Sequence, residues 1–333
     1  MNKNFAPMNM AGVFDRVMHV YAKSFGKQMA FSAIAGILTS IVFSMAGVLV
    51  AILIALLFVA SEGITSIILS VAIVVVLGTL WFSLFNAGAV LLSKTAFYET
   101  KIKLPINQLP VATLRVCTAF LAQILVFIPI VLAGGFFYSR ILFGIIDSFN
   151  FTASAVIAFI VISLIVFVAY LMLENIFAVT MAVATFEGRW FFGAVIRSWE
   201  LIKHDFWKVL ITRFLWIIAT MCIFYAAYGV LFLFMILNYW LMDTFGAWAI
   251  DSFEIAAMVI YSIVSIIIAF AAFPLNGIMQ AVIYYNQRIK HEALDIEIMI
   301  EETENELAEM QKENTLKELE GFTLKHPQGD KSP

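Results

Sequence analysis

Long apolar runs constrain this chain more than any other feature of its sequence. They cover roughly residues 29–60, 64–93, 116–138, 153–181, 206–239 and 254–285. A helix that crosses the ~30 Å hydrocarbon core of a bilayer needs ~20 apolar residues, and all six runs reach that length. Membrane-spanning barrel strands would instead show ~10-residue segments of alternating polarity. The sequence therefore predicts an all-α membrane protein with about six transmembrane helices.

The composition of the 333 residues supports this class. Hydrophobic residues make up 63% of the chain and charged residues 13%, whereas soluble domains carry about 25% charged residues. No basic cluster is dense enough to predict nucleic-acid binding.

The basic residues predict the orientation in the membrane. With Arg213 counted at the end of its helix, all of the 20 Lys and Arg residues except Arg140 fall on one side. Because Lys and Arg accumulate in cytoplasmic loops, both termini are expected in the cytoplasm of a bacterial cell, in its cytoplasmic (inner) membrane. The external loops, 61–63, 139–152 and 240–253, are then short.

Three segments on the basic side are candidates for amphipathic helices at the membrane surface, each preceding a transmembrane hairpin. They are 11–28, 105–118 and 190–208. Apolar residues recur in them at helical spacing, namely Val13, Val17, Val20, Tyr21 and Phe25 in the first and Val195, Trp199, Ile202 and Phe206 in the last.

An internal repeat is suggested by an alignment of the first and last of these segments. Gly12, Arg16, Phe25 and Lys27 align in one register with Gly193, Arg197, Phe206 and Lys208, and in another register Arg16 aligns with Arg115. We expect residues 1–286 to form the transmembrane domain, built from three such units.

The C-terminal region has a different character. Residues 287–320 are rich in Glu and predict an acidic cytoplasmic helix, with Ile296, Ile300, Leu307 and Met310 as an apolar stripe. Such a helix is either a solvated stalk, or a short coiled coil or docking helix. In the second case residues 287–320 would bind a cytoplasmic or membrane protein partner. Residues 321–333 are expected to be disordered.

Polar residues inside the predicted spans are the candidates for a functional site, because charges in lipid usually face the interior of a helix bundle. Glu174 and Arg213 lie at similar depth in neighbouring spans, and Pro274 would kink the last span. The remaining candidates are amides in the cytoplasmic third, Asn86, Gln123, Asn175, Asn276 and Gln280. Either Glu174 and Arg213 pair beside a polar site open to the cytoplasm, or the pair only joins two helices.

Enzyme motifs are absent from the sequence. It has no phosphate-binding glycine loop, no HExxH and no GxSxG. The four His residues are scattered, and the two Cys residues have no metal-ligand spacing. Gly134 and Gly135 favour helix packing over a ligand loop. We therefore expect no enzymatic activity, no cofactor and no metal site.

Three stretches resemble a known family. They are GAVIRSWELIKHDFWKVL at 193–210, AVIYYNQRIKHEALDIEIMIEE at 281–302 and FDRVMHVYAKSFGKQM at 14–29. They are similar to short motifs of bacterial multi-pass proteins named after the membrane domain of glycerophosphoryl diester phosphodiesterase. The matching positions are Arg197, Ser198, Trp199, Glu200, Leu201, Phe206, Trp207, Tyr284, Tyr285, Arg288, Glu292, Leu294 and Asp295. Asn286 stands where that family usually has Asp, and Ala293 where it has Gly.

The resemblance implies a membrane module without catalysis, because the phosphodiesterase activity of fused relatives resides in a separate soluble barrel. Two functions remain open. One is a non-enzymatic scaffold or accessory subunit that binds partners or lipid headgroups at the cytoplasmic face. The other is a transporter or lipid-moving protein that uses the polar site in the bundle.

Overall fold

The computed structural model describes residues 7–60, 64–97, 106–148, 153–245, 250–293 and 307. The described residues contain helices and no strands. The chain divides into two compact units, residues 8–284 and residues 1–7 with 285–333. The helices are α1 (Met10–Ala60), α2 (Ile64–Phe97), α3 (Leu109–Ser148), α4 (Ala153–Ile176), α5 (Thr180–Phe186), α6 (Phe191–Ile202), α7 (Phe206–Phe245) and α8 (Ile250–Glu292).

Five stretches of the described residues are long and apolar enough to cross a membrane. They are Val75–Lys94, Leu109–Arg140, Ile157–Phe186, Phe206–Ala226 and Met258–Glu292. The protein is therefore an all-α, multi-pass membrane protein. The first predicted span, 29–60, lies within α1, and its place in the membrane stays a prediction.

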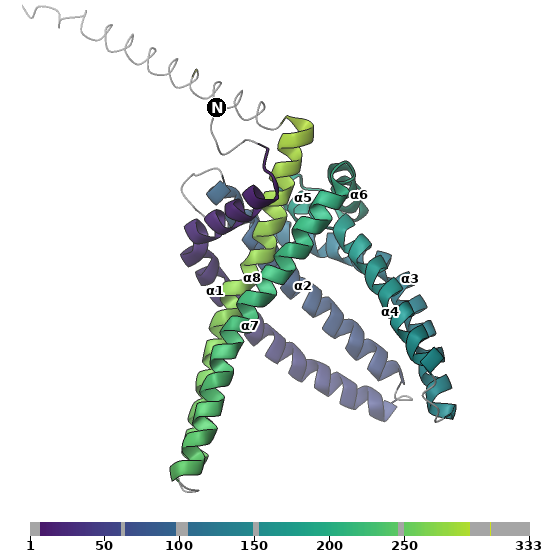
Figure 1. The fold of residues 1–333 in the computed structure, drawn as a ribbon, viewed down its shortest axis with the longest axis vertical. Coiled ribbons are helices and arrows are strands. Elements are labelled where there is room, and N and C mark those ends of the chain that lie inside the picture. The colour runs from purple at the N-terminus through teal and green to yellow at the C-terminus, as the bar shows by residue number, and fades with distance from the viewer. Residues whose placement is uncertain are drawn as a thin grey trace, which may run out of the picture. The chain divides into compact units, whose positions relative to one another are not determined.

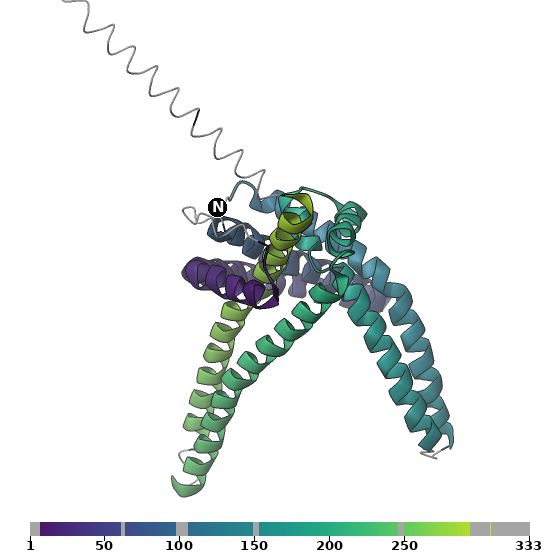
Figure 2. The same cartoon turned by 45° about the horizontal axis from the view of Figure 1, so that its top comes forward.

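Consecutive long helices form hairpins. Helix α1 packs against α2, and α3 against α4. Figures 1 and 2 both show α7 and α8 running side by side. The short helix α5 contacts α2, α3 and α6, and its residues Thr180–Thr185 are all buried.

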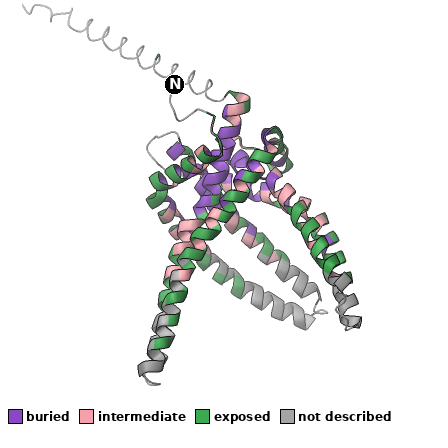
Figure 3. Cartoon of the chain, viewed as in Figure 1, coloured by how far each residue is buried: buried purple, intermediate pink, exposed green. Residues whose placement is uncertain are grey.

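Most of the buried residues lie at the ends of the helices that the charge pattern predicts to be cytoplasmic (Figure 3). In α7 they are Val209, Thr212 and Trp216, all in the first three turns, and in α8 they begin at Pro274. Among the residues of α4 whose side chains are described, Asn175 near the end of the helix is the one that is buried. Where their side chains are described, the opposite halves of the helices expose mostly apolar residues, as expected where lipid replaces water.

Small residues let the helices approach closely at the buried end. A β-carbon added to Gly277 of α8 would lie 2.8 Å from the β-carbon of Ala89 in α2. One added to Gly36 of α1 would lie 2.5 Å from the Phe270 ring of α8. Such contacts are typical of helix packing in membranes. Gly134 likewise faces Val166 of α4, at 3.6 Å, whereas Gly135 has open space.

The helix boundaries differ from the predicted ones in three places. The segment 11–28 is continuous with 29–60 in α1, and Gly26, which lies between the amphipathic pattern and the apolar run, does not end the helix. Residues 105–118 likewise do not form a separate helix, because α3 begins at Leu109 and runs through to Ser148. The third difference, between 176 and 206, has a tertiary cause.

The helix of the predicted fourth span, 153–181, is interrupted within the apolar stretch Ile157–Phe186, because the last turn of α4 is held by other helices. Helix α4 stops at Ile176, whose carbonyl accepts a hydrogen bond from the Ser198 hydroxyl at 2.7 Å. The following turn is closed by Ala178 N–H to Asn175 O at 3.0 Å and Thr180 N–H to Phe177 O at 3.1 Å. The segment 190–208 also divides, into α6 and the start of α7, with a turn at 203–205.

Residues 287–292 continue α8 without a break, so the predicted acidic helix begins as an extension of the last span. The remainder of the predicted 287–320 helix, apart from residue 293 and a helical Leu307, lies outside the described residues, as does the tail 321–333.

Candidate functional site

Glu174 and Arg213 form an ion pair between α4 and α7. The distance from Arg213 Nη2 to Glu174 Oε1 is 2.6 Å, and the arginine side chain is 11% exposed. Arg213 Nη1 also donates to the backbone carbonyl of Glu174. This carbonyl lies in the last turn of α4, where carbonyls lack partners within the helix. The arginine therefore joins two helices and also caps one of them.

The predicted amides do not converge on this pair. Asn175 donates from Nδ2 to the carbonyl of Phe206 at 3.0 Å, which fixes the start of α7 to the end of α4. Gln280 of α8 lies 3.7 Å from the sulfur of Met181 in α5. Gln123 is buried in α3, and its Nε2 has no hydrogen-bond partner among the described residues. Within the described residues, no hydrogen bond links any of these amide groups to the Glu174 carboxylate or the Arg213 guanidinium.

Asn86 and Asn276 instead share a cavity of about 410 Å³ between α2, α7 and α8. Its wall is mainly aromatic and aliphatic, with Trp216, Phe224 and Phe273 among the lining residues, and Thr220 adds a hydroxyl. Asn86 donates its amide to the carbonyl of Phe82 in its own helix at 2.8 Å. Neither Glu174 nor Arg213 is among the described residues that line the cavity. The single polar site expected from the sequence is thus divided over several places.

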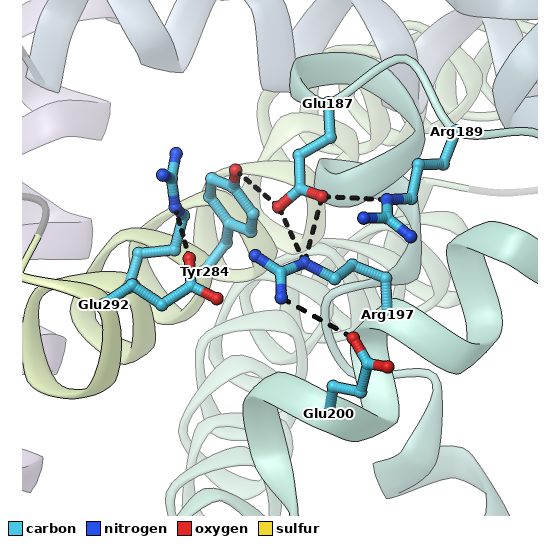
Figure 4. A network of polar contacts seen from close by, with 7 residues as sticks. Glu187, Arg189, Arg197, Glu200, Tyr284 and Glu292 are labelled. Atoms are coloured by element: carbon cyan, nitrogen blue, oxygen red, sulfur yellow. Dashed lines mark hydrogen bonds and ion pairs between the residues drawn. The ribbon is translucent and has the colours of Figure 1, made fainter.

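A second charged cluster, which the sequence analysis missed, surrounds Glu187 at the end of α5 (Figure 4). Arg197 Nε lies 3.0 Å from Glu187 Oε2, and Arg189 Nε lies 3.1 Å from the same oxygen. The Tyr284 hydroxyl donates to the other oxygen at 3.1 Å. Arg197 also reaches Glu200 at 3.6 Å, one turn along α6. The Glu187 carboxylate therefore joins α5, α6 and α8.

The loop after Glu187 contacts a further arginine from α3. Gly188 has φ +71°, and a β-carbon added there would lie 2.8 Å from Arg115 Nη1. The Arg115 guanidinium also lies over the Trp190 ring, 5.5 Å from its centroid. Glycine fits the left-handed conformation that ends α5. The glycine that follows the apolar run was the sequence signal for this helix end.

Arg16 makes a comparable contact at the end of another hairpin. It donates to the carbonyl of Phe97 at 2.8 Å, and its guanidinium lies 4.7 Å from the centroid of the Phe97 ring. Arg16 thus lies over an aromatic ring at the end of α2, and Arg115, with which it aligns in the sequence, lies over an aromatic ring just after the end of α5.

Helix α6 presents two apolar faces. The buried face consists of Ala194, Val195, Ser198, Leu201 and Ile202. A separate stripe at i, i+4 and i+7 is exposed and consists of Phe192, Ile196 and Trp199. Trp199, which the sequence analysis placed on one stripe with Val195 and Ile202, therefore lies on the other face.

The remaining motif residues take separate positions. The Trp199 ring lies edge-on to Phe206, with 5.9 Å between centroids, and Trp207 is 63% exposed. Near the end of α8, Arg288 Nε and Glu292 Oε2 form an ion pair at 2.9 Å. Tyr285 precedes them in the same helix, and Asp295 lies outside the described residues.

Comparisons with family models, with curated proteins and with solved structures find no match for this chain. The resemblance to the phosphodiesterase membrane domain stays a prediction based on its short motifs.

Proposed function

We propose that this protein crosses a bacterial cytoplasmic membrane six times, with both termini inside the cell, and acts as a non-enzymatic scaffold or accessory subunit. Its partners would bind at the cytoplasmic face, as lipid headgroups or as proteins that dock on the acidic helix 287–320. The observation that carries the proposal is the exposed apolar stripe of α6 beside the buried, ion-paired end of the helices.

An exposed stripe of this kind favours a helix lying at the membrane surface. Phe192, Ile196 and Trp199 form one stripe along α6. Arg197 and Glu200 lie on the side of the helix between this stripe and the buried face. Aromatic residues beside charged ones suit the headgroup layer. Helix α6 would insert the stripe into the lipid and hold the Glu187 cluster at the interface.

An immersion-depth measurement tests this arrangement. In a background with Cys117 and Cys222 replaced by Ala, a nitroxide is attached at Ile196→Cys or, as the matched control, at Glu200→Cys on the same helix. In proteoliposomes we expect the label at 196 to collide more with oxygen and the label at 200 more with a water-soluble nickel chelate. Equal accessibility of both labels to the chelate would contradict a surface-lying α6.

The scaffold role is tested by truncation of the full-length protein. Deletion of 297–333 is expected to abolish co-purification of a stoichiometric protein partner in mild detergent, while deletion of only 321–333 leaves it unchanged. Circular dichroism checks that the bundle remains folded. Unchanged partner recovery after the longer deletion would count against docking through the acidic helix.

The parallel contacts of Arg16 and Arg115 with Phe97 and Trp190 favour descent of the hairpins from a duplicated unit. Repeats of this kind are also found in transporters.

The transporter or lipid-moving alternative is favoured by one observation, the cavity that Asn86 and Asn276 share beside Pro274 of α8. A fluorescent-phospholipid translocation assay in proteoliposomes tests it. Protein-dependent translocation that is lost on Asn276→Leu and kept on Asn175→Leu would support this function. Translocation equal to that of empty vesicles would exclude lipid movement under these conditions.

A further inference from the structure

Arg115 lacks the acidic partner that the other arginines in this region have. Arg189 and Arg197 both contact the Glu187 carboxylate. The Arg115 guanidinium makes no hydrogen bond or ion pair with any described residue, and its Nε is buried without a partner. A buried donor without an acceptor destabilises the fold, so this arrangement needs an explanation.

The charges around Arg115 balance one another without it, because Arg189 and Arg197 are matched by Glu187 and Glu200. Three guanidinium groups, those of Arg115, Arg189 and Arg197, gather around the loop, against the carboxylates of Glu187 and Glu200. Arg189 uses its Nε for Glu187, and its terminal nitrogens have no partner among the described residues. One positive charge in the group is therefore not compensated.

The loop 188–190 adds further donors. Within the described part of the chain, the backbone N–H groups of Gly188, Arg189 and Trp190 make no hydrogen bond to another residue. The Trp190 ring holds the Arg115 guanidinium from one side by a cation–π contact. Because the β-carbon is missing at Gly188, the guanidinium can lie directly against the backbone.

We propose that Arg115 and the loop Gly188–Trp190 form a binding site for a phosphate group. A guanidinium presents parallel N–H donors that match two phosphate oxygens, and the uncompensated charge favours an anion. Because Trp190 is half-exposed beside the apolar stripe of α6, a phospholipid headgroup can supply the phosphate. Free inorganic phosphate offers the same chemistry. The inference rests on the proposed position of α6 at the cytoplasmic interface.

Native mass spectrometry of the full-length protein in mild detergent tests the site. Phosphatidylglycerol is titrated against diacylglycerol, which has the same acyl chains and no phosphate. We expect the wild type to prefer phosphatidylglycerol and Arg115→Gln to weaken its binding about tenfold or more, as for a charge-assisted hydrogen bond. Arg140→Gln is the matched control, since it removes an arginine from the opposite end of α3, and it should bind like the wild type.

A second variant keeps the test decisive if Arg115→Gln does not fold. Arg115→Lys retains the charge and loses the planar pair of donors, so we expect a severalfold weakening. Binding by Arg115→Lys and wild type within twofold, or equal losses in the 115 and 140 variants, would overturn the proposal.

Inorganic phosphate distinguishes the two sources. If millimolar phosphate displaces phosphatidylglycerol from the wild type and binds Arg115→Gln more weakly, the site takes free phosphate. If it does not displace the lipid, the site takes the headgroup. The depth measurement on α6 is independent of this titration. A surface-lying α6 with no Arg115-dependent lipid binding would therefore refute the phosphate site alone.

Discussion

Exchange of Glu174 and Arg213 is expected to restore only part of the stability that the single substitutions remove. A simple ion pair would tolerate reversal of its charges. Here, however, Arg213 donates both to the carboxylate, at 2.6 Å, and to the backbone carbonyl of Glu174. A glutamate at 213 has no proton to donate to that carbonyl, which stays in place whatever side chain residue 174 carries.

The magnitudes follow from these two contacts. Hydrogen bonds between helices in membrane proteins contribute about 0.6 kcal/mol on average and about 1.7 at most. The partly buried pair belongs at the upper end, so we expect Glu174→Gln to cost about 1 kcal/mol and Arg213→Met, which loses both contacts, about 2–3 kcal/mol. In the exchanged protein, the negative charge of the glutamate at 213 beside the C-terminal end of α4 destabilises the fold by a further ~0.3–1 kcal/mol. The exchanged protein should therefore remain about 1–2 kcal/mol less stable than the wild type.

The assay is reversible unfolding by dodecyl sulfate in mixed micelles, followed by circular dichroism. The set comprises the wild type, both single variants, their combination and the exchanged protein, so that the coupling energy of the side chains is obtained separately. Because residues in contact commonly show interaction energies of about 0.5–3 kcal/mol, a remaining deficit of about 1 kcal/mol is measurable. Full recovery in the exchanged protein would refute the carbonyl contact, and a neutral Arg213→Met would refute any stabilising role of the pair.

Three further substitutions test the packing and the polar contacts by the same unfolding assay. Gly277→Ala should cost about 1–3 kcal/mol, because the added β-carbon would lie 2.8 Å from the β-carbon of Ala89 in α2 and neither atom can rotate away. In the control Gly78→Ala, the added β-carbon meets nothing within 4 Å, so the change should be neutral or stabilising. Equal effects of the two substitutions would contradict the close approach at Gly277. Tyr21→Phe should cost about 1 kcal/mol, since its hydroxyl donates to a carbonyl of α8 at 2.7 Å, and no loss would mean that this contact is unimportant. Glu187→Gln should cost about 2 kcal/mol. Glu200→Gln should cost under about 0.5 kcal/mol, because the Glu200 side chain is 47% exposed. The reverse order of the two losses would contradict the central position of Glu187.

The sequence was informative where one physical term dominates. A run of ~20 apolar residues has few alternatives to a membrane helix, and five such stretches are present in the described residues. A charge in a span needs a partner at its own level, and Glu174 and Arg213 lie at similar depth. This shared depth indicated the two residues that the structure joins at 2.6 Å.

The break after Ile176 had no such signal. The residues at 177–179 are Phe, Ala and Val, none of which ends a helix by itself. The break depends on hydrogen bonds from Ser198 to the Ile176 carbonyl and from Asn175 to the Phe206 carbonyl. Both partners lie more than twenty residues away in the chain, so local patterns carry no information about them.

Glu187 was missed for a different reason. The charge pattern of the loops predicts the orientation of the helices, but it gives no reason to expect a buried position for a loop carboxylate. Its side chain is nevertheless only 16% exposed, because two arginines and Tyr284 surround it. The amides were assigned to one site because they share a depth, but depth does not fix the direction of a side chain around its helix. That direction separates Asn86 and Asn276 from Gln123 and Gln280.

Most of these contacts gather at one end of the helices, although the Tyr138 hydroxyl of α3 also donates to the Ser163 hydroxyl of α4, at 2.8 Å, in the opposite halves. Lipid is as apolar as Leu or Ile, so apolar side chains alone do not select one helix partner over another in the membrane. Selectivity comes from close approach at small residues, such as Gly277, and from polar contacts, such as those of Glu187 and Arg213. All of these lie at the predicted cytoplasmic end. Exchanges of one apolar residue for another in the opposite halves, such as Leu132→Ile or Ile165→Leu, should therefore leave the arrangement of helices unchanged, whereas loss of a single polar contact at the buried end should weaken several helix contacts together.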